Sequence, residues 1–249
     1  MKPIIIEKIP KKVTVKMDLN PLIISSEVIE KHNQFWKEKI NENPSLRNGE
    51  VFTITNIEQD TEELKVTVTK TDYKHYLYTL YHEDCLSPCK VIYTCASVIT
   101  NDNYIVFGKM NKNSSTPGRL QFTGGGIDET DFNGETFDLV QNIGKEINEE
   151  MGLDINCPYT RHFFPKFVKH KGTHDFWAVM FELSVDYSVQ ELDELFQRHN
   201  QQLIENGDYP EFDKLIFVSL EKESIESFIQ NEKAPMVDYL TPILLKYVE

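Results

Sequence analysis

The chain has 249 residues, of which 40% are hydrophobic and 27% are charged, a composition typical of a folded globular protein. Its 40 acidic and 26 basic residues give a formal net charge of −14, which argues against general binding to nucleic acid because such binding relies on Lys and Arg against phosphate. The longest apolar run, VIYTCASVI, is too short to span a bilayer, so no membrane association is expected.

The first residues and the cysteines indicate the cellular compartment of the protein. The start, MKPIIIEKIPKK, has no long apolar segment followed by a small-residue cleavage site, so no signal peptide is expected. A reducing cytoplasm with free thiols is therefore the expected setting. His82, Cys85 and Cys89 are close in sequence, but a zinc site usually needs a second ligand pair, which this stretch lacks.

The first part of the chain has the pattern of short strands around one long helix. IIIEKI and KVTVKM are typical of strands, and Ser26 is the expected N-cap of a helix over EVIEKHNQFWKEKINEN. The stretch NPSLRNG ends that helix with Pro44 and turns at Asn48-Gly49. EVFTITNIEQ and ELKVTVTKT alternate as in a hairpin, and residues 72–84 are expected to form a short helix.

A domain boundary is predicted near LSPCK, between an N-terminal region, residues 1–89, and a second domain, residues 90–249. After it, KVIYTCASVIT and NYIVFGKMN are expected to form a second hairpin, and NSSTPGR a loop. Further strands are predicted in HDFWAVMFELSV and KLIFVSL, and helices in QELDELFQRHNQQLIEN and ESIESFIQ. Strands mixed with helices, without a regular alternation, indicate the α+β class or a mixed-sheet sandwich.

A helix is also predicted over residues 138–152, and its acidic residues indicate chemistry. Glu146, Glu149 and Glu150 lie on an arc beside the apolar stripe, where their like charges repel unless a cation neutralises them. A solvated acidic face is the alternative. Carboxylates on a rigid helix are suited to Mg²⁺ or Mn²⁺. Gly152 is the expected C-cap, and the apolar stripe consists of Leu139, Val140, Ile143, Ile147 and Met151.

Three glycines, Gly124 to Gly126, stand between GRLQFT and this acidic stretch. Glycine there lets the backbone approach a phosphate, and a free carbonyl can bind a metal. The run matches neither the P-loop pattern nor G-x-G-x-x-G. Arg119 and Gln121 precede it, and Arg119 is a candidate for holding a phosphate, with a structural arginine as the equal alternative.

The stretch GGGID…GE…KEINEEMGL resembles the Nudix box, written G-x5-E-x7-R-E-U-x-E-E-x-G-U, where U is a bulky aliphatic residue. Residues 145–153 match at every position but one, because Lys145 replaces the usual arginine and lacks its planar fork. The front half is longer than the pattern, with nine residues between Gly125 and Glu135 and nine more between Glu135 and Lys145. The role of Glu135 therefore stays open.

The resemblance implies a Nudix-type α/β/α sandwich with a mixed sheet, and hydrolysis of a nucleoside diphosphate linked to another moiety. Cleaving a pyrophosphate bond needs neutralised phosphate charge and an oriented water, which carboxylate-bound Mg²⁺ or Mn²⁺ can supply. The implied partner is a small-molecule nucleotide. A homodimer is left open, because Nudix enzymes often dimerise.

The resemblance also implies roles for individual residues. Glu149 and Glu150 would be metal ligands, Glu146 a metal ligand or the general base, and the Gly125 carbonyl a further ligand. Lys145 would orient a glutamate. The expected substrate-binding residues are Arg119, Gln121, Gly124 and Gly126. A further acid comes from a downstream loop in many members, and the candidates here are Asp208, Glu211 and Asp213.

Residues 35–52 together with TKTDYKHYLYT resemble the N-terminal region of a Nudix subgroup that includes UDP-glucose and UDP-galactose hydrolases. This indicates a nucleotide sugar, cleaved to a nucleoside monophosphate and a sugar phosphate. The alternatives are a Nudix hydrolase of capped RNA, which the negative charge disfavours, and a nucleotide-binding module without catalysis. Arg47, Phe176 and Trp177 are weaker candidates for substrate contacts, since turn and core roles fit them better.

Overall fold

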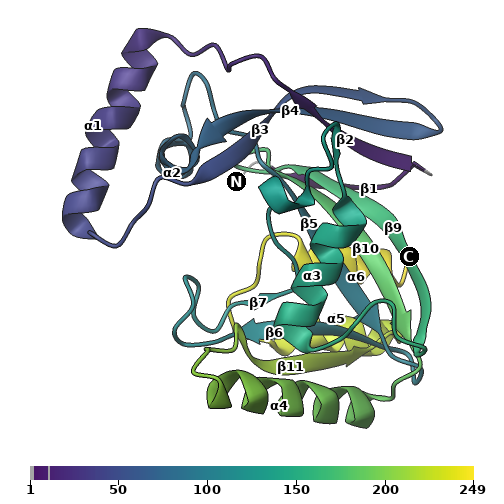
Figure 1. Cartoon of the computed structure of the whole chain (residues 1–249). Helices are drawn as coiled ribbons and strands as arrows, with labels where there is room; N and C mark the ends of the chain where they lie inside the picture. The colour runs from purple at the N-terminus through teal and green to yellow at the C-terminus, as the bar shows by residue number, and fades with distance from the viewer. Residues whose placement is uncertain (1–2, 11) are drawn as a thin grey trace. The chain divides into compact units, whose positions relative to one another are not determined.

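The computed structural model describes residues 3–10 and 12–249, and its fold belongs to the predicted α+β class (Figure 1). Met1, Lys2 and Lys11, which belong to the segment used for the signal-peptide expectation, lie outside the described residues. In the part that is described, no helix has both the length and the apolar composition needed to cross a membrane. The four cysteines are free thiols.

The chain divides into two compact units, and each unit is built from three separate segments. The first unit contains the described residues up to Tyr93, together with residues 126–139 and 168–178. The second unit contains residues 94–125, 140–167 and 179–249. The assignment of residues 1–89 and 90–249 to two domains stays a prediction.

The first unit holds a four-stranded sheet of order β3-β4-β2-β8. The predicted hairpin is confirmed, because β3 and β4 pair antiparallel, while β2 runs parallel to β4. Leu64, Val66 and Val68 of β4 are fully buried, as expected when alternate residues of a strand face a core. The strands of this unit are β1 (Ile4–Lys8), β2 (Lys12–Asp18), β3 (Glu50–Gln59), β4 (Glu63–Asp72) and β8 (Thr136–Phe137).

Two helices of the first unit pack against each other, α1 (Ser26–Glu42) and α2 (Tyr73–Tyr81). The N-cap of α1 is Ser25, whose side chain accepts a hydrogen bond from the Val28 N–H, so the prediction of Ser26 was wrong by one residue. Their contact is aromatic, with the His32 and His75 rings stacked at 4.8 Å.

The second unit contains most of a seven-stranded sheet in which the strand order is β1-β9-β10-β5-β6-β11, with β7 paired to β6. The predicted hairpin of β5 and β6 is confirmed. Three of these strands, β5, β9 and β10, have one end in the first unit. The strands are β5 (Ile92–Ile99), β6 (Tyr104–Met110), β7 (Leu120–Gln121), β9 (Thr160–Lys171), β10 (Trp177–Val185) and β11 (Phe212–Ser219).

Helices cover both faces of this sheet. Thr94 of β5 donates its hydroxyl hydrogen bond to Asn142 of α3, whereas Ser97 lies 2.6 Å from the Tyr247 hydroxyl at the end of α6. Since side chains alternate along a strand, positions three residues apart point to opposite faces. The predicted α/β/α sandwich is therefore confirmed. The helices of the second unit are α3 (Leu139–Met151), α4 (Val189–Glu205), α5 (Lys222–Asn231) and α6 (Leu240–Lys246).

Helix α3 is the predicted acidic helix, and Gly152 follows it with a φ of 68°. Four of the five predicted core residues are buried, but Val140 is 48% exposed, so its assignment was wrong. Val140 lies between Ile147 and Met151 on the apolar arc, so its angular position does not explain its exposure. Asn142 is fully buried instead, because the Thr94 hydroxyl satisfies its side-chain oxygen.

We expect the stability of the first unit to depend on His32. Burial, and next the charge of the neighbouring His75, lower the pKa of this imidazole from 6.5 to about 4. The unfolded chain therefore binds more protons than the folded chain between these values, so stability is lost as the pH falls from 6.5 towards 4, by at most about 3 kcal/mol.

Urea unfolding at pH 7 and at pH 5 measures this effect. His32→Phe should reduce the difference between the two pH values, while His162→Phe, at an exposed position, should not. An unchanged difference in His32→Phe would contradict the assignment.

Candidate active site

The first two glycines of the run, Gly124 and Gly125, lie along β5 within the second unit. The Ala96 N–H donates to the Thr123 carbonyl and the Thr94 N–H donates to the Gly125 carbonyl, each at 2.9 Å. The two backbones are so close at Gly124 that an added Cβ would overlap the Thr94 carbonyl oxygen and Cys95. The φ of Gly124 is 152°, which also disfavours other residues. Glycine is therefore required here by the fold.

This close approach brings two hydrogen-bond donors to Glu150. The Thr123 hydroxyl and the Gly124 N–H both donate to Glu150 Oε2, the second at 3.1 Å. The Glu150 side chain is buried, with 4% of its surface exposed. At about 100° per residue, Glu150 falls only about 20° from Ile143, inside the arc of the buried stripe. A carboxylate in such a place is unfavourable unless donors or a cation compensate its charge.

Two further carboxylates act on Glu150. Burial raises the pKa of Glu150 well above its ordinary value, the Thr123 hydrogen bond opposes that shift, and the charges of Glu211 and Glu146 raise it further. The Glu146 carboxylate lies against Gly125, where an added Cβ would be 2.5 Å from its Oε1 atom. The arrangement thus concentrates negative charge around one buried oxygen pair.

Strand pairing explains why Glu211 reaches this cluster. Its carbonyl accepts a hydrogen bond of 2.8 Å from the Asn111 N–H, and the next residue, Phe212, pairs with Met110 of β6. On the other side of β6 lies β7, which leads into Thr123. Two strand spacings of about 4.8 Å each separate β11 from β7. The side chains of Glu211 and Glu150 together can span this distance.

The sequence left three downstream acids open, Asp208, Glu211 and Asp213. Of these, Glu211 has a charge that acts on Glu150. Asp208 instead sits just after α4, where its N–H donates to the Leu203 carbonyl at 2.9 Å. Asp213 is an exposed residue of β11.

Glu149 differs from the other two glutamates of α3. Its side chain is exposed, and its carbonyl accepts a hydrogen bond of 2.8 Å from His199 Nε2. His199 in turn packs against Gly152, where an added Cβ would be 2.6 Å from the His199 Cβ. Within residues 3–10 and 12–249, no three His, Cys, Asp or Glu side chains already have the arrangement of a metal-ligand set. The metal roles of Glu146, Glu149, Glu150 and Gly125 stay predictions.

The expected substrate-binding residues before the glycines contact each other. The Arg119 guanidinium donates two hydrogen bonds to the Gln121 side-chain oxygen, through Nε at 3.1 Å and through its second terminal nitrogen. Gln121 is buried and Arg119 is partly buried. Lys145 is also partly buried, next to Glu146 in α3. Substrate binding by Arg119, Gln121, Gly124 and Gly126 stays a prediction.

The extra residues of the lengthened box belong to the first unit, where Gly126 begins the segment. Within this segment, a short 3₁₀ turn (Glu129–Asp131) precedes β8, which pairs with β2. Glu135 is exposed, its carboxylate lies 3.3 Å from Lys16 Nζ, and its carbonyl accepts a hydrogen bond from the Met17 N–H. These contacts give Glu135 a structural role at the edge of the sheet.

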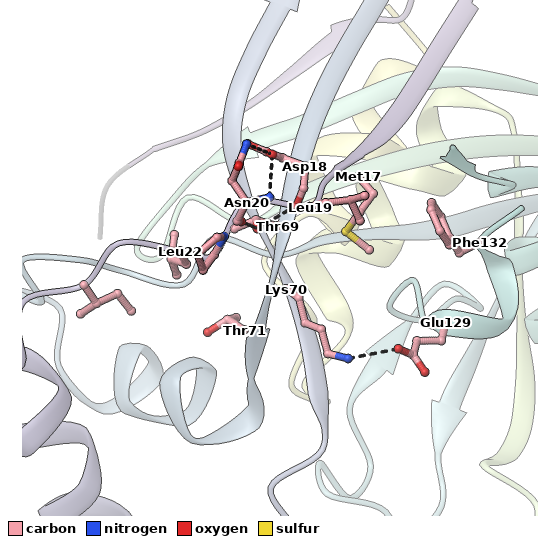
Figure 2. Close-up of a pocket in the computed structure, with 12 residues that line it drawn as sticks. Met17, Asp18, Leu19, Asn20, Leu22, Thr69, Lys70, Thr71, Glu129 and Phe132 are labelled. Carbon is pink, nitrogen blue, oxygen red and sulfur yellow. Dashed lines mark hydrogen bonds and ion pairs between the residues drawn. The ribbon is translucent and has the colours of Figure 1, made fainter. Parts of the chain in front are cut away.

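The first unit also contains a cavity of about 790 Å³, which the sequence did not indicate (Figure 2). Lys70 crosses one side of it, with Nζ 3.2 Å from Glu129 Oε1, and also contacts Glu50. Asp18 adds another negative charge to the lining. Because the lysine is already neutralised and acids are in excess, this cavity is poorly suited to a phosphate group. Met17, Leu22 and Phe132 supply apolar lining.

The weaker sequence candidates have structural roles. Trp177 is buried, and its ring stacks on His170 at 4.8 Å, as expected for a core residue. Phe176 packs against Tyr76 at 5.6 Å. The Arg47 guanidinium donates to the carbonyls of its own turn, which fits the turn role.

No protein-family model and no curated protein matches this sequence. Among solved structures, the chain is similar to a MutT protein from Methanosarcina mazei, with 16% identity over 64% of this chain and 93% of that one (TM-score 0.40). It is similar to the Nudix domain of NrtR from Shewanella oneidensis in complex with ADP ribose, with 12% identity over 68% and 94% (TM-score 0.39).

A third similar structure is a bifunctional NMN adenylyltransferase/ADP ribose pyrophosphatase from Francisella tularensis, complexed with AMP and a manganese ion. The identity is 15% over 69% of this chain and 45% of that one, with a TM-score of 0.42. At this distance, the chemistry of the chain has to be inferred from its own residues.

Substitution by alanine should change the stability of the protein to a different extent at each of the three glycines. Gly124→Ala should destabilise the protein by roughly 2–4 kcal/mol, because its Cβ meets backbone. Gly125→Ala meets only the flexible end of Glu146, so the fold should survive with that carboxylate displaced. Gly126→Ala meets nothing within 4 Å and serves as the stability control.

Thermal unfolding of the three variants measures this order. Equal losses of melting temperature in all three would contradict the close approach at Gly124.

Proposed function

We propose that this chain is a Nudix-type hydrolase that cleaves the pyrophosphate bond of a nucleoside diphosphate linked to another moiety. The observation that carries the proposal is the buried Glu150 carboxylate, which is held by Thr123 and Gly124 and repelled by Glu146 and Glu211. A chain selected for stability alone has no need of such a cluster. The match of residues 145–153 to the Nudix box adds independent support.

The residues of the cluster fit a hard divalent cation such as Mg²⁺ or Mn²⁺. Carboxylate and carbonyl oxygens are the ligands these ions prefer. Both donors to Glu150 bind Oε2. Gly125 uses one lone pair of its carbonyl for the Thr94 N–H, and a carbonyl oxygen has a second one. A cation here would also compensate the repulsion among Glu146, Glu150 and Glu211.

The chain's own groups have distinct parts in the proposed reaction. Thr123 and Gly124 hold Glu150 in one orientation before any ligand arrives, which lowers the reorganisation needed during the reaction. Glu146 and Glu211 are the two carboxylates that can take a proton from the attacking water. A bound divalent ion would supply charge neutralisation on the phosphate oxygens.

A small-molecule nucleotide is the proposed substrate class, and a UDP-sugar is the first to test because of the resemblance of residues 35–52. The net charge of −14 disfavours capped RNA. A nucleotide sensor without catalysis is the other candidate, and the presence of Glu146, Glu149 and Glu150 favours hydrolysis over it.

We expect metal-dependent hydrolysis that is lost in Glu150→Gln. The substrate is identified by its products in a panel of candidates, each tested with Mg²⁺, Mn²⁺ or chelator. The panel contains UDP-glucose, UDP-galactose, ADP-ribose, NADH, dinucleoside polyphosphates, oxidised dNTPs and capped RNA.

In Glu149→Gln and Glu150→Gln, kcat should fall at least about 10²-fold. The metal-free melting temperature of Glu150→Gln should rise at pH values high enough to ionise Glu150, because the buried charge and its repulsion by Glu211 and Glu146 are then removed. Unchanged turnover in both variants would overturn the assignment.

We expect Lys145→Arg to be tolerated, because an arginine keeps the charge and adds a planar fork. Turnover should stay within about threefold of the parent chain, whereas Lys145→Met should lose activity through the missing charge. Steady-state kinetics on the substrate found in the panel checks this. A large loss in Lys145→Arg would mean that Lys145 does something other than orient a carboxylate.

A further inference from the structure

Two neighbouring residues of α4, His199 and Asn200, contact the two elements that carry the carboxylates of the proposed site. His199 Nε2 lies 2.8 Å from the Glu149 carbonyl oxygen, and Asn200 Nδ2 donates to the Phe212 carbonyl at 3.1 Å. Because a carbonyl can only accept, the hydrogen of the first bond is on His199 Nε2. Adjacent residues of a helix point about 100° apart, so one helix can contact α3 and β11 at the same time.

The contact of His199 is with the last turn of α3. The Glu149 carbonyl is one of the last four of the helix, which have no partner within the helix itself. The Asn148 carbonyl accepts from the Gly152 N–H at 2.9 Å, and His199 supplies the donor for the next carbonyl. An added Cβ at Gly152 would be 2.6 Å from the His199 Cβ, so this glycine also makes room for the imidazole. The turn that His199 holds carries the side chains of Glu149 and Glu150.

The contact of Asn200 is with the start of β11. The chain bends at Glu211, and the pairing of β11 with β6 shifts between Phe212 and Lys214. A shift of this kind disrupts the ladder locally, so the sheet alone holds the backbone less firmly there. The bond from Asn200 to the Phe212 carbonyl adds an anchor one residue after Glu211.

Helix α4 is itself fixed on the second unit. Its Leu192 and Phe196 side chains are fully buried. Phe196 precedes His199 by three positions and Asn200 by four, so these residues lie on the same side of the helix. Ser188 forms a capping box at the first turn. The two hydrogen bonds therefore start from a rigid support.

We propose that His199 and Asn200 are positioning residues of the proposed active site. Through α4 they limit how far the last turn of α3 can move from the start of β11. A divalent cation then gathers the carboxylates by moving side chains alone, without moving the backbone. The inference rests on the proposed function, because it takes Glu149, Glu150 and Glu211 as groups that meet this cation.

Like charges on the two elements give the restraint its purpose. The charge of Glu211 acts on Glu150, and two carboxylates repel each other when no cation lies between them. Separation of α3 from β11 would relieve this repulsion, and the bonds of His199 and Asn200 oppose it. Groups that hold metal ligands in place change metal affinity although they do not touch the metal.

His199→Ala and Asn200→Leu should each weaken the binding of Mn²⁺ to the full chain by about 2- to 12-fold, the effect of one lost hydrogen bond. Calorimetric titration with Mn²⁺ alone, at a temperature where thermal unfolding shows the variants to be folded, measures this. If His199→Ala is unfolded there, Asn200→Leu, which keeps about the same side-chain size, carries the test.

Two further variants control this experiment. His199→Gln should retain the parent affinity, because the glutamine amide nitrogen can donate from about the same distance along the side chain. Gln197→Ala changes an exposed residue of the same helix and should leave Mn²⁺ binding unchanged. A purely structural role would lower the melting temperature but leave the Mn²⁺ affinity of the folded protein as it was. Unchanged affinity in both His199→Ala and Asn200→Leu would therefore overturn the proposal.

The metal dependence of turnover separates positioning from catalysis. In both variants turnover should fall at limiting Mn²⁺ and return to within about twofold of the parent at saturating Mn²⁺. A loss that excess Mn²⁺ does not restore would contradict a positioning role.

These outcomes can be told apart from failure of the proposed function. If the parent hydrolyses nothing but its Mn²⁺ affinity depends on His199 and Asn200, hydrolysis is refuted and the positioning role survives. If Glu150→Gln loses turnover while both variants bind Mn²⁺ as the parent does, the reverse holds. A parent chain that binds no Mn²⁺ would refute the positioning role.

Discussion

The site depends on one close approach of two backbones, where residues 123–125 run beside the start of β5. Because Gly124 has no side chain, its N–H and the Thr123 hydroxyl both reach Glu150. Because Gly125 has none, the Glu146 carboxylate has room beside it. The buried Thr94–Asn142 bond then ties α3 to the same strand. A single tight contact thus sets the positions of two carboxylates relative to the sheet.

The sequence was sufficient for the features that depend on local pattern. The period of α3, its C-terminal glycine and both hairpins follow from neighbouring residues, and the structure has them. The same periodicity puts Glu150 within the apolar arc, so its burial could have been foreseen. Val140 was misassigned because a position within the apolar arc of a helix need not be covered by the rest of the chain.

Features that depend on partners far along the chain could not be read in this way. Thr94 and Thr123 are ordinary strand residues until the fold brings them to Asn142 and Glu150. The choice of Glu211 over Asp208 and Asp213 follows from the pairing of β11 with β6, which no local pattern encodes. Likewise, the lengthened box gave no sign that its extra residues would pair with β2.

The way the two units share the chain has a consequence for how the protein is made. The polypeptide passes from one unit to the other five times between Met1 and Glu249. No single cut therefore releases either unit whole, and a fragment that begins after residue 93 would lack most of the first unit while keeping two of its segments. Many native contacts join distant residues, which is typical of slow folding. During synthesis, the first unit stays incomplete until residue 178 has left the ribosome.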